Sequence, residues 1–521
     1  MKVSEEDRVR ALLYYVPTGT TEGEKHILRE AFVQTDEYAE IVTPPPGSPR
    51  LLVGKKGSGK SAILDFTLNF VRKSGVPALL IKPMDLDFGE ISPEASSGEL
   101  TRLAYGALVR AIAANTGAQL DGFLTGPKKI LYQEAVSAGA RDLDLFGKVT
   151  RLMAALASPL TGSNLSELLP NTDKAAINKL ERAVRENAEQ SSGAFYLLVD
   201  DTDQIASPSV KGHLNRIWAF FLAARELTSR IDKVRCIITL RDEVWRALAK
   251  ENVGQRDQWD HFLRLVHHLN PDVDHIERIV EKRLILAAAR CGTVATKAPY
   301  RMFFEGDSPR MPTSEQRSSW PDIIKTRSRE RPRDAVQLIN MLAKQAASPL
   351  PALITEDTLA SVMPIYSKER ADLLAQEFER ECPSLDQVLR SFAGVEYDNG
   401  SFLASAGLIR KHLSTLPSAF SLSLDGRVLK PCEDEDAFRL WAFLYSIGLM
   451  YPRVSDSRQP AKYRFVNPQE EPDFVAKDRW NDMQKALWEV HPVYRDYLIA
   501  VQRDEAAQFG LPTKRKPGKR R

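Results

Sequence analysis

The sequence has few of the residues that build disulfide frameworks or zinc sites. Its four cysteines, Cys236, Cys291, Cys382 and Cys432, lie far apart in a chain of 521 residues and include no C-x-x-C pair. Its eight histidines form no H-E-x-x-H or H-x-H pattern. Widely spaced cysteines of this kind are typical of reduced thiols, so we expect a cytoplasmic protein without a disulfide frame or a structural metal site.

Long apolar runs and a strong excess of one charge are also missing. The longest obvious apolar run, Trp218–Ala224, falls well short of the roughly 20 residues that span a bilayer. The start, MKVSEEDRVR, has no apolar signal segment. The formal net charge is only +3, and the last eight residues, KRKPGKRR, carry six positive charges. We expect no membrane partner, a body that is not strongly basic, and a disordered basic tail over 511–521.

The most informative stretch is Leu51–Phe66, which reads LLVGKKGSGKSAILDF. An apolar strand runs into a full G-x-x-x-x-G-K-[ST] match and then into a helix that we expect to begin near Ala62. In this setting backbone N–H groups point at phosphate, Lys60 reaches the β- and γ-phosphates, and the Ser61 hydroxyl binds Mg²⁺. The predicted nucleotide-binding residues are Gly54, Lys55, Lys56, Gly57, Ser58, Gly59, Lys60, Ser61 and Ala62. A glycine-rich turn without a ligand is the alternative.

A second signal is GAFYLLVDDTDQI, in which an apolar strand ends in two carboxylates. P-loop ATPases use such a strand opposite the phosphate loop. We predict that Asp200 binds Mg²⁺ and that Asp201 polarises the attacking water. The alternative is a strand that ends in an Asp-rich turn.

The strand Val234–Leu240 (VRCIITL) ends at Arg241-Asp242. In the additional-strand class of P-loop ATPases, a strand lies between the phosphate-loop strand and the acidic strand. A polar residue at its tip senses the γ-phosphate, and Thr239 or Arg241 suits that role here. A salt bridge from Arg241 to Asp242 or Glu243 is the alternative.

Further strands are expected at Val76–Ile81 and Leu265–Asn270, with a large helical insertion over about 88–190. Helical spacing returns at Asp272–Ala289 and at Ala335–Ala346, after Arg331-Pro332-Arg333-Asp334. The stretch 272–347 is typical of a lid over a nucleotide, with Arg333 the first choice to reach the γ-phosphate and Arg331 the second. The alternative is a solvated basic helix start.

The two ends of the chain carry weaker signals. A helix is expected over Glu22–Ile41, in which Phe32 and Tyr38 are candidates for contact with adenine, although core packing is the preferred interpretation. After a linker at Pro349–Pro351, a helix over Asp434–Ile447 precedes two strands, Leu449–Val454 and Tyr463–Val466. A final helical segment, broken at His491-Pro492, is expected over Asp478–Val501.

Helices followed by a β-hairpin are typical of a winged helix. Basic residues on such a hairpin can contact phosphates, although solvated edge-strand charges are the slightly preferred interpretation. These basic residues are Arg453, Arg458, Lys462 and Arg464.

These observations predict an α/β fold: a P-loop NTPase parallel sheet of the additional-strand class, with a helical insertion and a helical lid. A mostly helical C-terminal region with a winged-helix-like element follows. The predicted segments are an N-terminal helical segment 1–45, the NTPase core 46–271, the lid 272–347, the C-terminal region 348–510 and the tail 511–521.

Four segments in this order, GKKGSGKS, FYLLVDDTDQI, CIITLRDEVW and RERPRDAVQLIN, resemble bacterial P-loop ATPases of the AAA+/STAND kind, close to origin-recognition-like ATPases. Some members are ATPase components of anti-phage defence systems. The resemblance implies ATP and Mg²⁺ as cofactors, ATP-driven switching or homo-oligomeric assembly, and often a partner effector. The second acid is Asp where many relatives have Glu, which implies slow hydrolysis.

Two functions follow as hypotheses. The first is an ATP-dependent switch that regulates an effector in a defence-type system. The second is a DNA-binding loader or transposition-type regulator that uses the winged helix and the basic tail. A metabolic kinase fits poorly, because nothing resembles a pocket for a small acceptor. For an arginine acting on a neighbouring subunit, Arg256 and Arg264 are guesses from the sequence.

Overall fold

A computed structural model describes residues 4–81, 96–120, 124–138, 174–191, 193–205, 212–250, 261–269, 273–294, 298–312, 316–397, 402–458, 462–468 and 470–508. The chain divides into two compact units. The first, here the sheet unit, comprises Thr20–Ile279 and Arg331–Arg333. The second, the helical unit, comprises Met1–Gly19, Val280–Glu330 and Asp334–Arg521. The helical unit contains most of the predicted lid and the predicted C-terminal region, while residues 272–279 and 331–333 of the predicted lid fall in the sheet unit.

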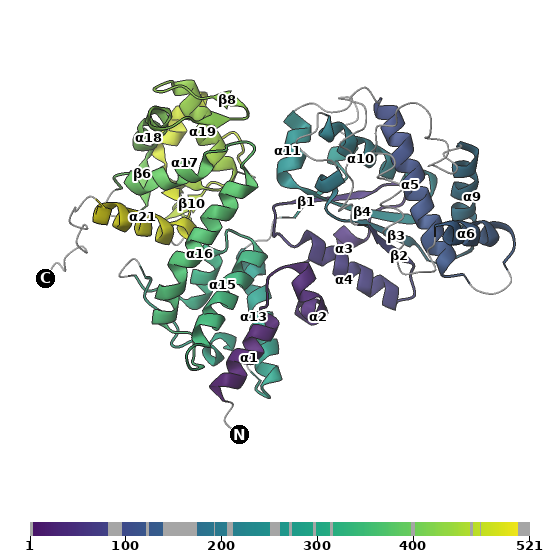
Figure 1. Ribbon diagram of the computed structural model, residues 1–521, viewed down its shortest axis with the longest axis horizontal. Coiled ribbons are helices and arrows are strands. Elements are labelled where there is room, and N and C mark those ends of the chain that lie inside the picture. The colour runs from purple at the N-terminus through teal and green to yellow at the C-terminus, as the bar shows by residue number, and fades with distance from the viewer. Residues whose placement is uncertain are drawn as a thin grey trace. The chain divides into compact units, whose positions relative to one another are not determined.

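The sheet unit is built on five parallel strands (Figure 1). They are β1 (Arg50–Gly54), β2 (Ala78–Ile81), β3 (Phe195–Val199), β4 (Val234–Arg241) and β5 (Val266–His268). Their spatial order is β2-β3-β4-β1-β5. Arg50 of β1 is paired with Ile237 of β4, and Phe195 of β3 with Val234 of β4. The predicted parallel sheet is therefore confirmed, including a strand between the phosphate-loop strand and the acidic strand.

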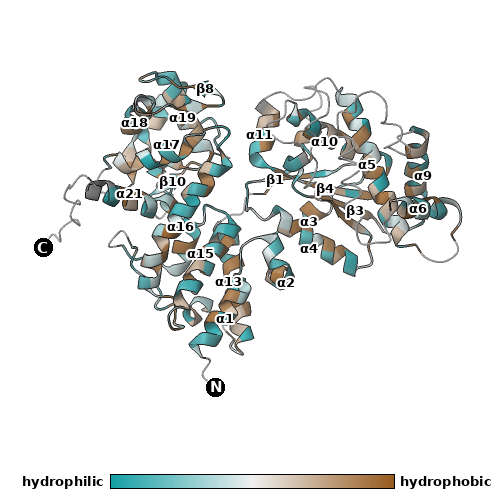
Figure 2. Ribbon diagram, viewed as in Figure 1, coloured by the Kyte–Doolittle hydropathy of each residue, from teal (hydrophilic) through white to brown (hydrophobic). Residues whose placement is uncertain are grey.

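The strands alternate their side chains between two apolar layers, as a sheet buried on both faces must. Leu51 and Val53 of β1 join one core cluster, which is shared with α5 (Ser97–Ala118), α9 (Lys174–Gln190), α10 (His213–Arg230) and α11 (Asp242–Lys250). Leu52, between them, faces a second cluster with Ile63 of α4 (Lys60–Lys73) and Ile41 of α3 (Tyr38–Val42). Figure 2 shows the matching hydrophobic colouring of β3 and β4. The strand ends are held from both sides, which fixes the loops that follow them.

The helices of this unit differ from expectation in two places. The stretch expected as one helix over Glu22–Ile41 forms α2 (Thr21–Ala31) and α3 (Tyr38–Val42), because the chain leaves the helix at Phe32, where ψ is 128°. The P-loop helix α4 is Lys60–Lys73, so it begins before Ala62. The other helices are α5 (Ser97–Ala118), α6 (Gly126–Ser137), α9 (Lys174–Gln190), α10 (His213–Arg230), α11 (Asp242–Lys250) and α13 (Val273–Arg290), with the 3-10 turn η1 (Thr202–Ile205).

Most described residues of the insertion are helical. The helices α5, α6 and α9 fall within the predicted limits, and α5 packs on α6, α9 and α10. The loop predicted at Ser158–Asn164 lies outside the described residues. The helix α6 begins at Gly126 with a proline in its first turn, which shortens the loop expected over Gly122–Pro127.

The helical unit contains α1 (Glu5–Tyr15) and most of the chain after α13. Its helices are α14 (Trp320–Arg327), α15 (Pro332–Ala346), α16 (Glu356–Glu377), α17 (Leu385–Ser391), α18 (Ala406–Ala419), α19 (Asp434–Ser446), α20 (Trp480–Lys485) and α21 (Arg495–Gln508). Its 3-10 turns are η2 (Pro299–Met302), η3 (Phe392–Gly394), η5 (Lys477–Arg479) and η6 (Pro492–Tyr494). Its strands are β6 (Leu403–Ser405), β7 (Ser423–Leu424), β8 (Arg427–Val428), β9 (Met450–Ser455), β10 (Tyr463–Phe465) and β11 (Leu487–Val490). The unit boundaries fall within α13 and α15.

A helix followed by an antiparallel hairpin, α19 and then β9–β10, occurs where the sequence predicted it. The broken helical segment predicted over Asp478–Val501 is correct for α20 and α21 but wrong between them, because Leu487–Val490 forms β11. This strand lies between β9 and β6 in a four-stranded sheet. Trp488 of β11 is fully buried, and its ring lies 4.5 Å from that of Trp441 on α19.

A buried ion network fixes the start of α15 in this unit. Asp334 accepts from Arg329 Nε and from Arg370 Nη1, each at 2.7 Å, and all three side chains are almost fully buried. Tyr366 donates its hydroxyl to the Asp334 carbonyl at 3.0 Å. Buried charges persist only when they are paired in this way, so Asp334 has a structural role here.

Among the described residues, no helix is both long and apolar enough to cross a membrane.

Candidate nucleotide site

The phosphate loop begins where β1 ends, and Gly54 is required there by close packing. A Cβ atom at Gly54 would lie 2.9 Å from the backbone oxygen of Leu269 and 2.8 Å from Ser58 Oγ. The backbone oxygen cannot move aside as a side chain could. The loop therefore leaves the sheet in contact with the chain that follows β5.

The loop then turns through left-handed backbone conformations. Gly57 has φ +82° and Gly59, the residue before α4, has φ +103°. Glycine adopts these angles without the steric cost of a side chain. The turn delivers the chain into the N-terminus of α4, where free N–H groups and the helix dipole favour an anion.

One polar atom in the loop supports the fit of an anion. Ser58 is 5% exposed, and its Oγ has no hydrogen-bond partner among the described residues. A buried hydroxyl without a partner costs free energy, which a phosphate oxygen accepting its proton would recover. The residues present therefore fit a phosphate group.

Lys60 is the first residue of α4, and its ammonium folds back over the loop. Its Nζ donates to the carbonyl oxygens of Gly54 at 2.6 Å and Lys55 at 3.0 Å. Burial lowers the pKa of Lys60 by removing the charge from water. The Glu243, Asp203 and Asp200 carboxylates oppose that shift. The negative charge near Lys60 thus comes from carboxylates that follow β3 and β4.

The acidic strand places its first carboxylate deep in the sheet unit. Asp200 is 1% exposed, and Asp200 Oδ1 accepts from the Thr239 hydroxyl at 2.7 Å. The backbone N–H of Asp201 donates to the same Thr239 oxygen at 3.1 Å. The Thr239 proton is therefore committed to Asp200, which makes Thr239 a positioning residue for the two acids. Asp201 itself has φ +52° and is partly exposed.

Of the two acids weighed as salt-bridge partners of Arg241, only Glu243 lies within ion-pair distance of its guanidinium. Asp242 is paired instead with Arg246, one turn along α11, at 2.8 Å. The Nε of Arg241 lies 2.9 Å from Asp203 Oδ2, and its Nη1 lies 3.9 Å from Glu243 Oε1. Asp203 was missed by sequence reasoning, although a third acid two residues after Asp201 was a visible signal.

The two arginines predicted near the γ-phosphate also lie against the loop. The Cβ of Arg333 is 3.2 Å from the position of a Cβ on Gly57, and the Cβ of Arg331 is 3.8 Å from it. The Arg333 amide is within 3.5 Å of the Gly57 carbonyl, a weak hydrogen bond. Arg331 is 6% exposed and Arg333 is partly exposed.

Other candidates lie elsewhere. Phe32 stacks on Phe66 with ring centroids 4.2 Å apart, and the Tyr38 hydroxyl is 3.1 Å from Thr67 Oγ1. Both aromatic side chains therefore belong to the core beside α4, as the preferred interpretation held. Arg264 is exposed after β4 and before β5, and Arg256 lies outside the described residues.

The metal site would depend on the nucleotide as well as on protein. No group of three or more His, Cys, Asp or Glu in the described ranges is arranged to hold a metal ion. Mg²⁺ commonly takes one or two protein ligands together with phosphate oxygens and waters. Ser61, the second residue of α4, and Asp200 are residue types that fit this pattern.

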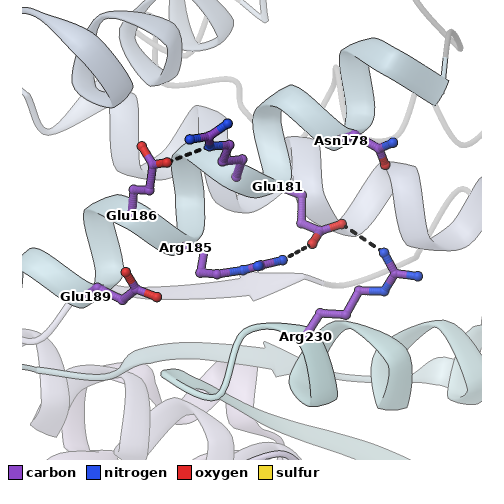
Figure 3. Close-up of a pocket in the computed structure, with 7 residues that line it drawn as sticks. Asn178, Glu181, Arg185, Glu186, Glu189 and Arg230 are labelled. Carbon is purple, nitrogen blue, oxygen red and sulfur yellow. Dashed lines mark hydrogen bonds and ion pairs between the residues drawn. The ribbon is translucent and has the colours of Figure 1, made fainter.

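A separate polar groove of about 400 Å³ lies between α9 and α10, and none of the loop residues lines it. Figure 3 shows Arg185 and Arg230 converging on Glu181 from two sides. Glu181, 4% exposed, also accepts from the Tyr105 hydroxyl of α5 at 2.8 Å. The arrangement joins three helices through one buried carboxylate, which is a structural role.

No family model matches the chain. A curated protein of Escherichia coli (strain K12), named "Putative transposon gamma-delta 80.3 kDa protein", is 20% identical over 503 residues, which cover 91% of this chain. The match spans 65% of the length of that relative.

Among solved structures, the Aeropyrum pernix ORC1 protein in complex with DNA is similar at 14% identity. The match covers 96% of this chain and 98% of that one, with a TM-score of 0.31. A likeness at this level supports no conclusion about function. The assignment of a P-loop NTPase fold rests on the strand order and the loop geometry.

Proposed function

We propose that the chain is a Mg²⁺-dependent ATPase that works as a nucleotide-driven switch. One observation carries the proposal: the loop after β1, the acids after β3 and the arginine that ends β4 converge at one edge of the sheet. Parallel α/β sheets bind ligands beyond the carboxyl ends of their strands.

In this proposal the loop residues Gly54–Ala62 hold the phosphates, and Lys60 neutralises the β- and γ-phosphates. Ser61 and Asp200 hold the Mg²⁺, which supplies positive charge to the phosphate oxygens when it is bound. Asp201 orients and polarises the attacking water. Arg241 and Arg333 act on the γ-phosphate, with Arg331 in support.

The switching role is supported by the place of Arg331–Arg333 in the chain. These three residues group with the phosphate loop, while Asp334 is held by Arg329 and Arg370 within the helical unit. Arg333 directly precedes Asp334, so a ligand that contacts Arg333 would act next to this buried ion network. Within this proposal the stretch 272–347 acts as the lid and 348–510 as the region that carries the response.

The molecular mass in solution tests the switch. We expect a larger assembly with a nonhydrolysable ATP analogue and Mg²⁺ than with ADP or without nucleotide, because only the analogue offers a γ-phosphate to the arginines. Light scattering measures this directly. The Lys60→Ala chain, measured in parallel, should show one mass throughout. A wild-type mass that is equal in all three states would argue against nucleotide-driven self-assembly.

A DNA-associated function is the second candidate, because the curated relative is named for a transposon. The helix–hairpin arrangement of α19, β9 and β10 supports a winged-helix-like element, and Arg458 and Lys462 on its hairpin are exposed. Two of the four basic hairpin residues are less available, since Arg453 pairs with Glu489 at 3.1 Å and Arg464 with Glu471 at 3.3 Å.

A salt titration of duplex DNA binding tests this second candidate. We expect the full chain to bind, and the slope of log K against log salt to fall by about 1 for each phosphate contact removed. The variants are a chain ending at residue 511 and the double change Arg458→Ala/Lys462→Ala. Binding that survives the loss of the tail but falls with the hairpin change supports this function; loss of all binding with the tail alone contradicts it.

A more specific version of the switch proposal is that the switch regulates a partner effector in an anti-phage defence system. That version rests on the sequence resemblance alone.

A further inference from the structure

We infer that Asp203 is a positioning residue for Arg241, and that this pair determines how strongly the site distinguishes ATP from ADP. The inference rests on the proposed nucleotide site and concerns the regulation of that site. Its basis is the contact between η1 and the end of β4.

The contact is rigid on both sides. Thr202, the first residue of η1, is fully buried, and its hydroxyl donates to the Thr239 carbonyl of β4. This hydrogen bond ties η1 to the end of β4 without help from Asp203. The Asp203 carboxylate, whose side chain is 9% exposed, is therefore not needed to hold the turn in place.

The pairing sets the direction of the guanidinium. Asp203 Oδ2 lies 2.9 Å from Arg241 Nε, the inner edge of the fork, while Glu243 lies 3.9 Å from Nη1. The Arg241 side chain is 30% exposed, so its terminal nitrogens face a region that solvent or a ligand can reach. An arginine held at Nε keeps its outer donors available for a phosphate oxygen.

The strand register places this pair at the phosphate end of the site. Arg241 of β4 is paired with Gly54, the first residue of the phosphate loop, at the end of the neighbouring strand β1. Two cations close together repel each other, and a nearby carboxylate reduces that cost. Asp203 therefore lowers the cost of placing Arg241 at the same end of the site as Lys60, where a third phosphate would meet both.

A double-mutant cycle tests the inference through the ratio of ATP to ADP affinity. We expect Asp203→Asn and Arg241→Gln each to lower the ratio by roughly 10-fold, the scale of one charge-assisted hydrogen bond. The double variant should lie within about 3-fold of Arg241→Gln alone, because residues that act through one another are not additive. Asp203→Glu, which keeps the charge, should recover part of the ratio.

The matched control is Asp242→Asn, which makes the same chemical change one residue from Arg241 but removes the separate pair with Arg246. Its ratio should equal that of wild type. Titrating fluorescent ATP and ADP into one preparation makes the ratio independent of any unfolded fraction. A wild-type ratio in Asp203→Asn, or effects that multiply in the double variant, would overturn the inference and leave the nucleotide site standing. Absence of ATP binding by the wild-type chain would instead remove the proposed function itself.

Discussion

Replacement of Lys60 by alanine is expected to weaken ATP binding by at least roughly 100-fold, the loss of one or two charge-assisted hydrogen bonds. The structure gives two reasons. The ammonium is the cation held over the loop, and it reaches the Gly54 and Lys55 carbonyls from the first residue of α4. Without it, the N–H groups of the loop lose the cation that lies closest to them. Calorimetric titration with ATP and Mg²⁺ measures the change.

The control for that experiment is Lys73→Ala. Lys73 is the last residue of the same helix and is exposed, so it has the same charge on the same element without the loop contacts. Its ATP affinity should match that of wild type. Comparable melting temperatures for the two variants would show that the loss is local. An unchanged ATP affinity in Lys60→Ala would contradict the assignment of the loop.

Asp201→Asn is expected to lose hydrolysis and to retain ATP binding. An amide cannot accept the proton of the attacking water, and loss of a general base costs roughly 100- to 10,000-fold in turnover. Asparagine also tolerates the left-handed backbone at this position, where φ is +52°, so the exchange removes the charge with little added strain. Phosphate release under single-turnover conditions measures the rate, and nucleotide titration measures the affinity.

A change at the neighbouring Asp200 distinguishes Mg²⁺ binding from general-base catalysis. Asp200→Asn should raise the Mg²⁺ concentration needed for half-maximal activity, whereas Asp201→Asn should leave that concentration unchanged. If instead Asp201→Asn hydrolyses ATP at the wild-type rate, the general base lies elsewhere and Asp201 serves only the turn. A Mg²⁺ requirement shifted by both variants would mean that the two acids share the metal.

The phosphate loop could be predicted because its chemistry is local. Eight consecutive residues contain the glycines that turn the backbone, the lysine and the hydroxyl, and an apolar strand precedes them. The acidic strand was predictable for a similar reason, since five apolar residues deliver their acids at a strand end. The position of β4 between β1 and β3 followed from the class of ATPase that these motifs resemble.

The features that sequence reasoning missed depend on neighbours in space. Asp203 became relevant only because η1 brings it beside Arg241, which lies on a different strand. The strand β11 lies within a stretch predicted to be helical. Its pairing with β9 and β6 decides its conformation. In both cases the deciding contacts come from residues distant in the sequence.

The spatial order of the sheet has a consequence for the chain as it is synthesised. β1 is made early, yet both of its neighbours, β4 and β5, come from residues after Val234. A nascent chain that ends before Val234 contains the complete phosphate loop and both acids, but has no strand to join them. A ligand of the loop therefore cannot stabilise the growing chain by mass action until β4 has emerged. The growing chain must therefore reach β4 before β1 and β3 can be joined in the order of the finished sheet.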